Sequence, residues 1–367
     1  MKTILHVIDS TEPGGAETVF AQLADELRKR GYRSLTVVSG PGWVTDELRR
    51  RGLQPIIIDA KGAFNWRLVR GLVRIIRAEK VDLIQSHLLG SNVYCALAGL
   101  IAHKPVIATF HGMVDVSPEE RLRWLKFQIM NLGVSRFVAV SQRLCDAIHK
   151  EGLLNPRKTT VIYNGIEFER YGRSSRQELR ELLGLPGDAV LIGSLGNLHP
   201  AKGYEYLIRA AGIVSRRHPS AHFVIGGDIK EHLIGDLRTL MADSGVCDRV
   251  HFIGFVKDSA AFLSQLDFFL LSSLSEGFSI ATVEAMATGL PMVVTRCGGP
   301  EEIVSEGQDA VMVDAGSYES ISAGLSALLD SPATAGQLAR RAKESVEGRF
   351  SMHAMIDRYM DLYAQNI

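Results

Sequence analysis

The chain has 367 residues, of which 46% are hydrophobic and 22% are charged. This composition is typical of a globular protein of about two domains, and it excludes a disordered, collagen-like or disulfide-dominated chain. Lys plus Arg and Asp plus Glu both total 41, so the net charge predicts no nucleic-acid partner. Residues 1–165 nevertheless hold 23 basic and 15 acidic residues, a net of +8, whereas residues 166–367 hold 18 and 26, a net of −8. We expect the two halves to meet different partners.

The four cysteines lie far apart and form no CxxC pair, at Cys95, Cys145, Cys247 and Cys297. This pattern favours a reducing compartment and argues against a disulfide framework or a structural zinc site. The apolar run at 4–8 is too short for a signal peptide, and no stretch reaches the ~18 to 20 apolar residues of a transmembrane helix. We expect a cytoplasmic protein, with peripheral attachment to the inner face of a membrane left open.

Short apolar runs alternate with helical patterns along the chain, such as the helices expected at 16–30 and 204–217. This alternation predicts α/β architecture with parallel sheets covered on both faces, where ligands bind beyond the carboxyl ends of the strands. A first series of strands is expected at 4–8, 34–38, 55–58, 83–86, 106–109 and 137–140. A second series is expected at 190–194, 222–225, 250–253, 268–271, 292–295 and 310–313.

Two series of strands indicate two doubly wound domains. The boundary is expected between 161 and 172, where the chain turns at Asn164-Gly165 and becomes polar. We therefore expect domains at 1–166 and 167–350. The tail at 351–367 is expected to form one amphipathic helix, whose apolar side consists of Met355, Ile356, Tyr359, Met360 and Leu362.

The strongest chemical signal lies at 275–291, after the apolar run 268–271. Ser279 is a suitable N-cap for a helix at 281–287, so the backbone amides near Gly277, Phe278 and Ile280 would form an anion site at the helix start. Two carboxylates, Glu276 and Glu284, flank this site. Beside a phosphate, they are suited to binding the hydroxyls of a ribose or a sugar. The spacing alone leaves open that they are ordinary solvated side chains.

Glu276 and Glu284, separated by seven residues and with Gly277-Phe278 after the first, resemble the signature of retaining GT-B glycosyltransferases of family four. Further segments are similar to motifs of that family and follow in the expected order over nearly the whole chain. They are 13–17 (Pro-Gly-Gly-Ala-Glu), 109–112 (Thr-Phe-His-Gly), 140–141, 161–166, 199–203 (His-Pro-Ala-Lys-Gly), 252–255 and 297–303.

The resemblance implies a GT-B fold, in which two facing Rossmann-like domains are joined by a C-terminal helix that crosses back to the amino-terminal domain. It also implies that Glu284 holds the nucleotide ribose and Glu276 a hydroxyl of the donor sugar. The amides of Phe278, Ser279 and Ile280 would bind the diphosphate together with the ammonium group of Lys202.

Other positions follow from the same resemblance. The base would lie against the loop at Phe255 and Val256. Gly15 would let the backbone approach the diphosphate, and Gly14 would lie on the acceptor side. Asn197 stands where the family usually has an arginine, so the diphosphate would lose one ionic partner at this position.

Two histidines follow predicted strands of the first series. His111 resembles the family histidine that contacts the donor sugar near the reacting carbon, and we expect it to be catalytic together with Glu276. His87 is expected either to contact the acceptor or to be structural. The histidines contain no HExxH pattern or similar spacing, so we expect neither a metal nor another cofactor.

The family resemblance implies transfer from a UDP- or GDP-linked sugar to a glycan or lipid-linked acceptor. The matched motifs of the amino-terminal half offer no nucleophilic carboxylate for a double displacement. The family resemblance instead implies a front-face reaction, in which the departing diphosphate takes the proton of the acceptor. A nucleotide-sugar epimerase and a weakly active sugar-nucleotide-binding protein remain as alternatives. A dinucleotide-dependent oxidoreductase does not fit, because Gly14-Gly15-Ala16 is no GxGxxG motif.

The basic half contains two stretches in which arginines and aromatic residues are mixed. They are either solvated helix faces or a docking surface for anionic lipid, which a lipid-linked acceptor would require. The first comprises Phe64, Trp66, Arg67, Arg70, Arg74 and Arg77, and the second Arg121, Arg123, Trp124, Lys126 and Phe127.

Overall fold

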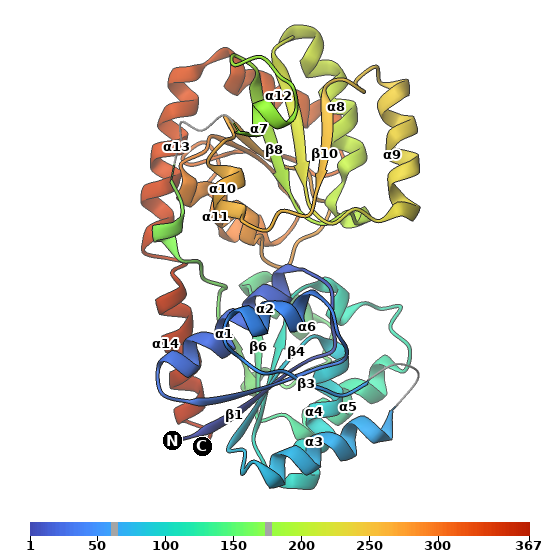
Figure 1. Ribbon diagram of the computed structural model, residues 1–367, viewed down its shortest axis with the longest axis vertical. Helices are drawn as coiled ribbons and strands as arrows, with labels where there is room; N and C mark the ends of the chain where they lie inside the picture. Colours follow the sequence, from blue (N-terminus) through green and yellow to red (C-terminus); the bar gives the residue numbers. More distant parts are fainter. Residues whose placement is uncertain (60–64, 173–177) are drawn as a thin grey trace. The chain divides into compact units, whose positions relative to one another are not determined.

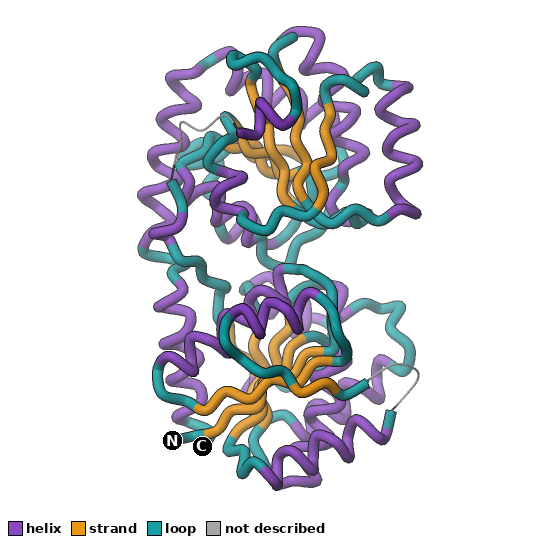
Figure 2. The backbone as a smooth tube through the Cα atoms, in the orientation of Figure 1, coloured by secondary structure: helices purple, strands orange, loops and turns teal. Residues whose placement is uncertain are grey.

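The computed structural model describes residues 1–59, 65–172 and 178–367, so Phe64 lies outside the described residues. The chain forms two compact units. Unit 1 consists of Met1–Asn164 and His353–Ile367, and unit 2 consists of Gly165–Met352. Each unit is a parallel sheet with helices on both faces, as Figures 1 and 2 show.

The sheet of unit 1 has seven parallel strands in the order β3-β2-β1-β4-β5-β6-β7. The strand order therefore reverses between β1 and β4, which is the position where doubly wound domains bind ligands. Every residue of β1, β4 and β5 is buried, as expected for the central strands of a parallel sheet. The strands are β1 (Thr3–Ile8), β2 (Arg33–Val38), β3 (Ile56–Ile57), β4 (Leu83–His87), β5 (Val106–Phe110), β6 (Arg136–Ala139) and β7 (Thr159–Val161).

The helices of unit 1 include the C-terminal helix, so the predicted return of the tail to the amino-terminal domain is confirmed. Its apolar side is buried through Met355, Ile356, Tyr359 and Leu362. Arg30, the C-cap of α1, also forms an ion pair with Asp357 of α14. The helices are α1 (Gly15–Lys29), α2 (Trp43–Arg50), α3 (Trp66–Ala78), α4 (Leu89–Ala102), α5 (Arg123–Gly133), α6 (Gln142–Lys150) and α14 (Met352–Ala364).

Unit 2 repeats this plan with six parallel strands in the order β10-β9-β8-β11-β12-β13, so its strand order reverses between β8 and β11. The strands are β8 (Val190–Leu195), β9 (Ala221–Gly226), β10 (Val250–Gly254), β11 (Phe268–Leu271), β12 (Met292–Arg296) and β13 (Val311–Asp314). The helices are α7 (Glu178–Leu182), α8 (Tyr204–Arg217), α9 (Glu231–Asp243), α10 (Ser259–Leu263), α11 (Ile280–Thr288), α12 (Tyr318–Asp330) and α13 (Pro332–Glu347).

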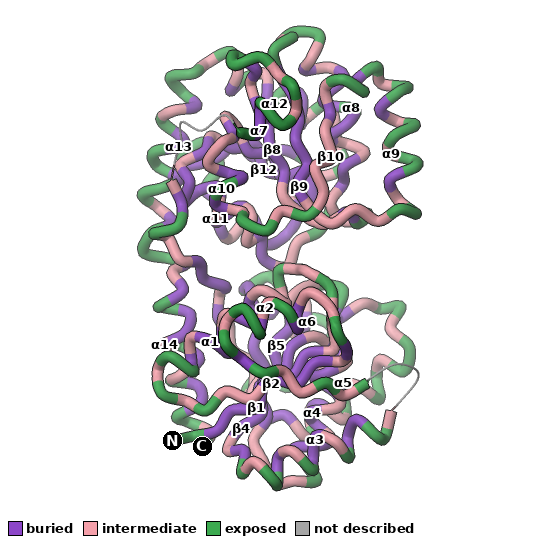
Figure 3. Tube along the Cα trace, in the orientation of Figure 1, coloured by how far each residue is buried: buried purple, intermediate pink, exposed green. Residues whose placement is uncertain are grey.

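Short 3-10 helices complete both units, namely η1 (Met113–Val116), η2 (Pro156–Lys158), η3 (Phe168–Arg170), η4 (Pro200–Lys202) and η5 (Gly299–Glu302). In both units the buried residues gather on the sheet and on the inner sides of the helices, as Figure 3 shows. Within the described part of the chain, no helix combines the length and the apolar character needed to cross a membrane.

The structure contains one strand that the sequence did not predict. β7 has three residues, two of them threonines, and all three are only half-buried. It pairs with β6 at the edge of the sheet. A short, polar edge strand lacks the apolar run on which strand prediction depends.

Candidate active site

Unit 2 holds Lys202 in a loop between β8 and α8 that is attached to the end of β11. The hydroxyl of Ser272 donates to the carbonyl of Lys202 at 2.9 Å. Gly203 has a φ of 60°, and a Cβ there would lie 2.3 Å from the carbonyl oxygen of Ser272, so glycine is required. A Cβ on Gly196 would lie 2.9 Å from Cε of Lys202. The two glycines thus make room for Lys202 at the carboxyl edge of the sheet.

Lys202 and Glu276 form an ion pair at this edge. Nζ of Lys202 lies 2.7 Å from Oε1 of Glu276, and the two side chains are 26% and 12% exposed. The hydroxyl of Ser273 donates to the same carboxylate oxygen at 2.7 Å. The residues predicted for the diphosphate and for the donor sugar are therefore neighbours. Ser273 is a third member of this group that the sequence analysis missed.

Helix α11 begins beside Glu276, and Ser279 is its N-cap as predicted. The Oγ of Ser279 accepts a hydrogen bond from the hydroxyl of Thr282 at 2.8 Å. The backbone N–H groups of Gly277, Ser279 and Ile280 donate to no acceptor among the described residues. The side chain of Phe278 is packed inward and only 7% of the residue is exposed. This edge of unit 2 therefore offers several N–H donors at a helix N-terminus, the usual setting for an anion.

Glu284 lies in α11 and is held by two hydroxyl groups from other segments. The hydroxyl of Tyr171 donates to Oε1 of Glu284 at 2.6 Å, and that of Ser259 donates to the same oxygen at 2.8 Å. No described residue donates to Oε2. Burial raises the pKa of Glu284 above its ordinary value, against the opposing effect of the two hydroxyls. The carboxylate is thus fixed through one oxygen, and the other is available to a ligand.

Tyr171 and Ser259 are functional candidates that the sequence analysis missed. They lie 113 and 25 residues from Glu284 in the sequence, and neither belongs to a recognisable motif. The position of Ser259 at the first turn of α10, directly after the loop predicted for the base, was the one available signal.

Asn197 follows β8 and joins two loops. Its Oδ1 accepts a hydrogen bond from the N–H of Asp228 at 3.0 Å. The next residue, Leu198, donates its N–H to the carbonyl of Asp228 at 2.8 Å. At this position, where the family usually has an arginine, Asn197 could contact the diphosphate only through its amide nitrogen. Its oxygen already accepts a hydrogen bond from the backbone.

The loop predicted for the base follows β10. Gly254 ends that strand with a φ of 77°, a conformation that favours glycine. Phe255 is 38% exposed. Val256 is partly buried and lies over Gly226, where a Cβ would come within 2.5 Å of Cγ2 of the valine. The loop thus presents the ring of Phe255 at the surface and anchors Val256 below it.

In unit 1, the structure brings His87 and His111 together. Nδ1 of His87 lies 2.9 Å from Nε2 of His111, and the two rings are stacked with centroids 5.1 Å apart. Burial lowers the pKa of His111 to about 3 and the pKa of His87 well below its usual value, so both are neutral at pH 7. His111 is partly exposed. His87 has no exposed surface, which favours the structural alternative for His87 over contact with the acceptor.

Asp115 fixes the backbone of His111. Its Oδ2 accepts a hydrogen bond from the N–H of His111 at 2.7 Å, and its Oδ1 accepts one from the N–H of Leu89 at 3.1 Å. Leu88, between His87 and α4, has a φ of 71°. Such a strained conformation in a leucine persists only where the surrounding structure enforces it. The sequence analysis did not identify Asp115, although it lies four residues after His111.

The glycine turn after β1 lies beside further carboxyl groups. Gly14 is the N-cap of α1, and a Cβ there would lie 2.2 Å from Oε2 of Glu17. Gly15 is the first residue of α1 and is exposed. Asp9 lies against Gly90, where a Cβ would come within 1.8 Å of Oδ2. Burial raises the pKa of Asp9 to about 6 and that of Glu17 above its ordinary value. The carboxyl edge of unit 1 is therefore acidic as well as histidine-containing.

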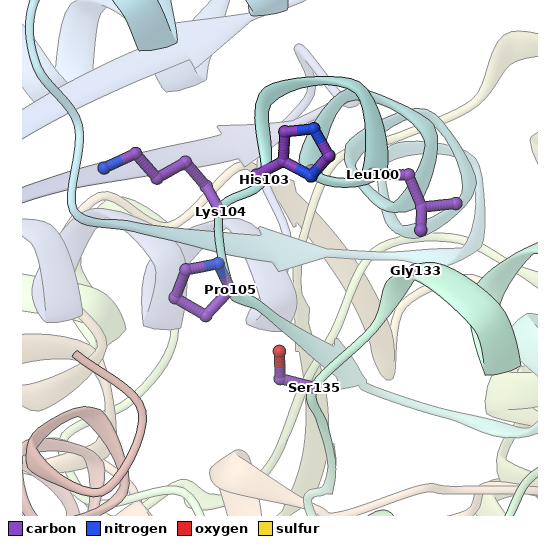
Figure 4. Close-up of a pocket in the computed structure, with 7 residues that line it drawn as sticks. Leu100, His103, Lys104, Pro105, Gly133 and Ser135 are labelled. Atoms are coloured by element: carbon purple, nitrogen blue, oxygen red, sulfur yellow. The ribbon is translucent and has the colours of Figure 1, made fainter.

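Two other features of the described residues lie apart from this chemistry. No group of three or more His, Cys, Asp or Glu side chains in the described ranges is arranged to hold a metal ion. A hollow of about 270 Å³ in unit 1 is lined by residues that include His103, Lys104, Pro105 and Ser135 (Figure 4). These residues directly precede β5 and β6, so the hollow lies at the amino edge of the sheet, opposite His111.

Both halves of the chain match models of known protein families. Residues 13–170 match the model for Glycosyltransferase Family 4, and residues 175–345 match the model for Glycosyl transferases group 1. The lipopolysaccharide core biosynthesis glycosyltransferase LpsE of Rhizobium meliloti (strain 1021) is 27% identical over 364 residues, which is 96% of each chain. An Escherichia coli UDP-Gal:alpha-D-GlcNAc-diphosphoundecaprenol alpha-1,3-galactosyltransferase is 25% identical over 80% of this chain and 77% of its own. The crystal structure of Anabaena Alr3699/HepE in complex with UDP-glucose has a TM-score of 0.90 at 24% identity and covers 100% of both chains.

Proposed function

The chain belongs to the group 1 glycosyltransferases of family four and transfers a sugar from a nucleotide sugar, and we propose that its reaction retains the anomeric configuration of the sugar and needs no metal. The proposed donor is a UDP-linked hexose, with GDP as the second choice. UDP is favoured because it appears in the names of two of the compared proteins. The proposed acceptor is a glycan or a lipid-linked glycan.

One observation carries the proposed donor site. Three N–H groups at the start of α11, which have no acceptor among the described residues, lie in the sequence between two carboxylates, Glu276 and Glu284, at the edge where the strand order of unit 2 reverses. In the proposal, the diphosphate binds these N–H groups and Lys202. Oε2 of Glu284 accepts hydrogen bonds from the ribose hydroxyls, and Glu276 accepts one from the donor sugar.

The proposed reaction is a front-face displacement. The bond between the anomeric carbon and the diphosphate oxygen breaks while the acceptor oxygen bonds to the same carbon. The proton of the acceptor passes to the departing diphosphate oxygen, so no protein base is required. The protein positions the two substrates and stabilises the leaving group through Lys202 and the amides of α11.

The carboxyl group beside His111 supports this choice over a double displacement. Both oxygens of Asp115 accept hydrogen bonds from backbone N–H groups, and the residue is only 6% exposed. A nucleophilic carboxylate needs an accessible oxygen. Asp115 is therefore suited to holding His111 in place and not to attacking the sugar.

We also propose that unit 1 docks on an anionic membrane surface to reach a lipid-linked acceptor. Arg67, Arg70 and Arg74 are exposed on α3, and no described carboxylate pairs with them. Around α5, four apolar residues are unusually exposed, at 65%, 70%, 46% and 75% for Leu122, Trp124, Leu125 and Leu132. Helix α4 packs against both α3 and α5. Basic and apolar side chains on neighbouring helices fit the interface of a charged bilayer.

The test of the proposed reaction is a panel of nucleotides followed by analysis of the released sugar. UDP, GDP and ADP are first ranked by the increase in melting temperature that each produces. The matching nucleotide sugar is then hydrolysed, and the first-formed anomer is identified by NMR. Retention predicts that the sugar is released with the anomeric configuration of the donor. The opposite anomer would overturn the retaining mechanism, and release of an epimerised sugar would indicate an epimerase.

A further inference from the structure

A buried chain of hydrogen bonds connects α14 to His111 within unit 1. The hydroxyl of Tyr363 donates to Oε1 of Gln85 at 3.0 Å. Nε2 of Gln85 lies 3.4 Å from Nε2 of His87, whose Nδ1 lies 2.9 Å from Nε2 of His111. Tyr363, Gln85 and His87 are 0% exposed. In such surroundings each polar atom requires a partner of the opposite hydrogen-bonding role.

The donor and acceptor roles along this series of hydrogen bonds follow from the contacts of Gln85. Nε2 of Gln85 donates to the carbonyl of Ser86 at 3.3 Å and to Oγ1 of Thr109 at 2.9 Å. A carbonyl oxygen only accepts, so the atom of Gln85 that faces Ser86 must be the amide nitrogen. The same nitrogen faces Nε2 of His87. The amide nitrogen carries two protons, of which one is directed at Oγ1 of Thr109 and the other is shared between the carbonyl of Ser86 and Nε2 of His87. Because an amide nitrogen cannot accept a hydrogen bond, this contact favours an unprotonated Nε2 on His87.

The remaining steps follow from the chemistry of neutral imidazole. A neutral imidazole carries its single proton on one nitrogen, and the bond made at one nitrogen decides where the proton lies. With Nε2 unprotonated, His87 carries its proton on Nδ1 and donates it to Nε2 of His111. His111 must then carry its own proton on Nδ1. No described residue accepts a hydrogen bond from Nδ1 of His111, and this atom is not among the buried, unpartnered side-chain atoms of the described chain.

We propose that Gln85 is a positioning residue that acts through His87 to fix the tautomer of His111. His111 then presents an N–H donor, at Nδ1, to an oxygen of the bound substrate. This inference rests on the proposed function, together with the family resemblance, which makes His111 a contact of the donor sugar. Tyr363 supports the same orientation of the Gln85 amide as Ser86 does, because its hydroxyl donates to Oε1 of Gln85. The C-terminal helix thus contributes to the site without touching the substrate.

The direct test is NMR of the full-length protein with 15N-labelled histidine, because the 15N shifts of an imidazole distinguish its protonated from its unprotonated nitrogen. The signals of His111 are assigned by their loss in His111→Ala. We expect both His87 and His111 to be protonated on Nδ1 and unprotonated on Nε2. Protonation of His111 on Nε2 would overturn the proposal. The spectrum needs no substrate, so its outcome is independent of whether the proposed transfer reaction is correct.

Two variants separate positioning from a structural role. Gln85→Glu keeps the shape but replaces the donor with an acceptor, so the proton of His87 should move to Nε2 and that of His111 to Nε2. We expect kcat to fall about tenfold or more, with KM for the nucleotide sugar within twofold. The matched control is Tyr359→Phe, which removes a buried hydroxyl of the same helix that contacts Thr109. It should keep the wild-type tautomers. If His111 stays protonated on Nδ1 in Gln85→Glu, Gln85 does not set the tautomer.

Discussion

His6 is a buried residue of β1 whose polar atoms lack partners. It is 0% exposed, and neither ring nitrogen has a hydrogen-bond partner among the described residues. Leaving a buried polar group unpaired costs about 1–3 kcal/mol. Burial also lowers the pKa of His6 to about 3, compared with about 6.5 in an unfolded chain. His6 therefore lowers the free energy of unfolding of unit 1.

The first prediction concerns the pH dependence caused by His6. Below pH 6.5 the unfolded chain binds a proton at His6 that the folded protein cannot bind until about pH 3, so stability falls as pH decreases through this window. In His6→Leu this loss disappears. Between pH 7 and pH 5, the variant should gain about 2 kcal/mol in unfolding free energy relative to wild type.

The measurement uses the distribution of tryptophans. Trp43, Trp66 and Trp124 all belong to unit 1, so their fluorescence during urea unfolding reports on that unit. Asp9 and Asp115 have raised pKa values and act with the opposite sign, but they are common to both proteins and cancel in the difference. The difference should be constant above pH 7. A difference that is also constant from pH 7 to pH 5 would show that His6 does not titrate as argued.

At the scale of residues, the sequence predicted those members of the candidate site that belong to local motifs. Glu276, Glu284, Ser279 and Lys202 lie within short segments of recognisable spacing, and their neighbours in the sequence are also neighbours in the fold. Gln85, by contrast, is related to His111 through the pairing of β4 with β5. Long-range partners of this kind depend on strand register and helix packing, which one sequence does not specify.

Helix α14 is the element that most clearly joins distant parts of the sequence. Tyr359 and Tyr363 are among the largest fully buried side chains of the described residues. Their hydroxyls bond Thr109 and Gln85, 250 and 278 residues away. Each buried large apolar side chain contributes about 1.5–3 kcal/mol. The amino-terminal unit therefore depends on the last residues of the chain.

The second prediction is that changes in α14 destabilise unit 1. Removal of the chain after Phe350 should lower the urea midpoint of the tryptophan transition. Ile356→Ala should do the same more mildly, with a loss of about 2–5 kcal/mol, because Ile356 is 0% exposed. Arg358→Ala, an exposed position of the same helix, is the control and should have no measurable effect. An unchanged tryptophan transition in Ile356→Ala would contradict this role of α14.

A third prediction concerns α3 and the proposed membrane surface. The protein should bind liposomes in proportion to their anionic lipid content, and binding should fall at ~0.5 M salt because screening shortens to a few Å. Replacing Arg67, Arg70 and Arg74 with Gln should reduce binding while donor hydrolysis is unchanged.

The control for this experiment is a triple variant of α13 in unit 2. Arg340, Arg341 and Lys343 are also exposed on one helix, so their replacement by Gln removes the same charge and should leave liposome binding unchanged. Absence of binding to anionic liposomes at low salt would mean that the acceptor is soluble and that α3 is a solvated face.

The prediction of strands and helices succeeded where burial requires a run of apolar residues. The two series of predicted strands correspond to β1–β6 and β8–β13, with small differences at their ends. Helix α8 occupies the predicted range 204–217. The predicted strand at 55–58 shortens to Ile56–Ile57, and β7 was missed. Both belong to sheet edges, where half-buried strands lack the long apolar runs of the centre.

At the scale of the whole molecule, the two units share a topology but differ in chemistry. Each reverses its strand order once and places its candidate residues at the carboxyl edge near that reversal. Unit 1 gathers neutral histidines and buried carboxyl groups there, whereas unit 2 gathers N–H donors, Lys202 and two carboxylates.

The fourth prediction concerns metal dependence. In the proposed site, the charge of the diphosphate is balanced by Lys202 and the N–H groups of α11, so a divalent ion is not needed. Transfer activity should therefore be retained in EDTA, measured as release of the nucleotide. An absolute requirement for added manganese or magnesium would contradict the proposed charge balance.

The central claim is that Glu284 and Glu276 divide the donor between them, the first holding the nucleotide and the second the sugar. Calorimetric titration of UDP and of the UDP-sugar into wild type, Glu284→Gln and Glu276→Gln tests this claim most directly. Glu284→Gln should weaken UDP binding by about 1.5–3 kcal/mol, as expected for hydrogen bonds to a charged group. Glu276→Gln should bind UDP at least as tightly as wild type, because Lys202 loses its ion-pair partner, but it should lose affinity for the UDP-sugar. Unchanged UDP affinity in a folded Glu284→Gln protein would contradict the account.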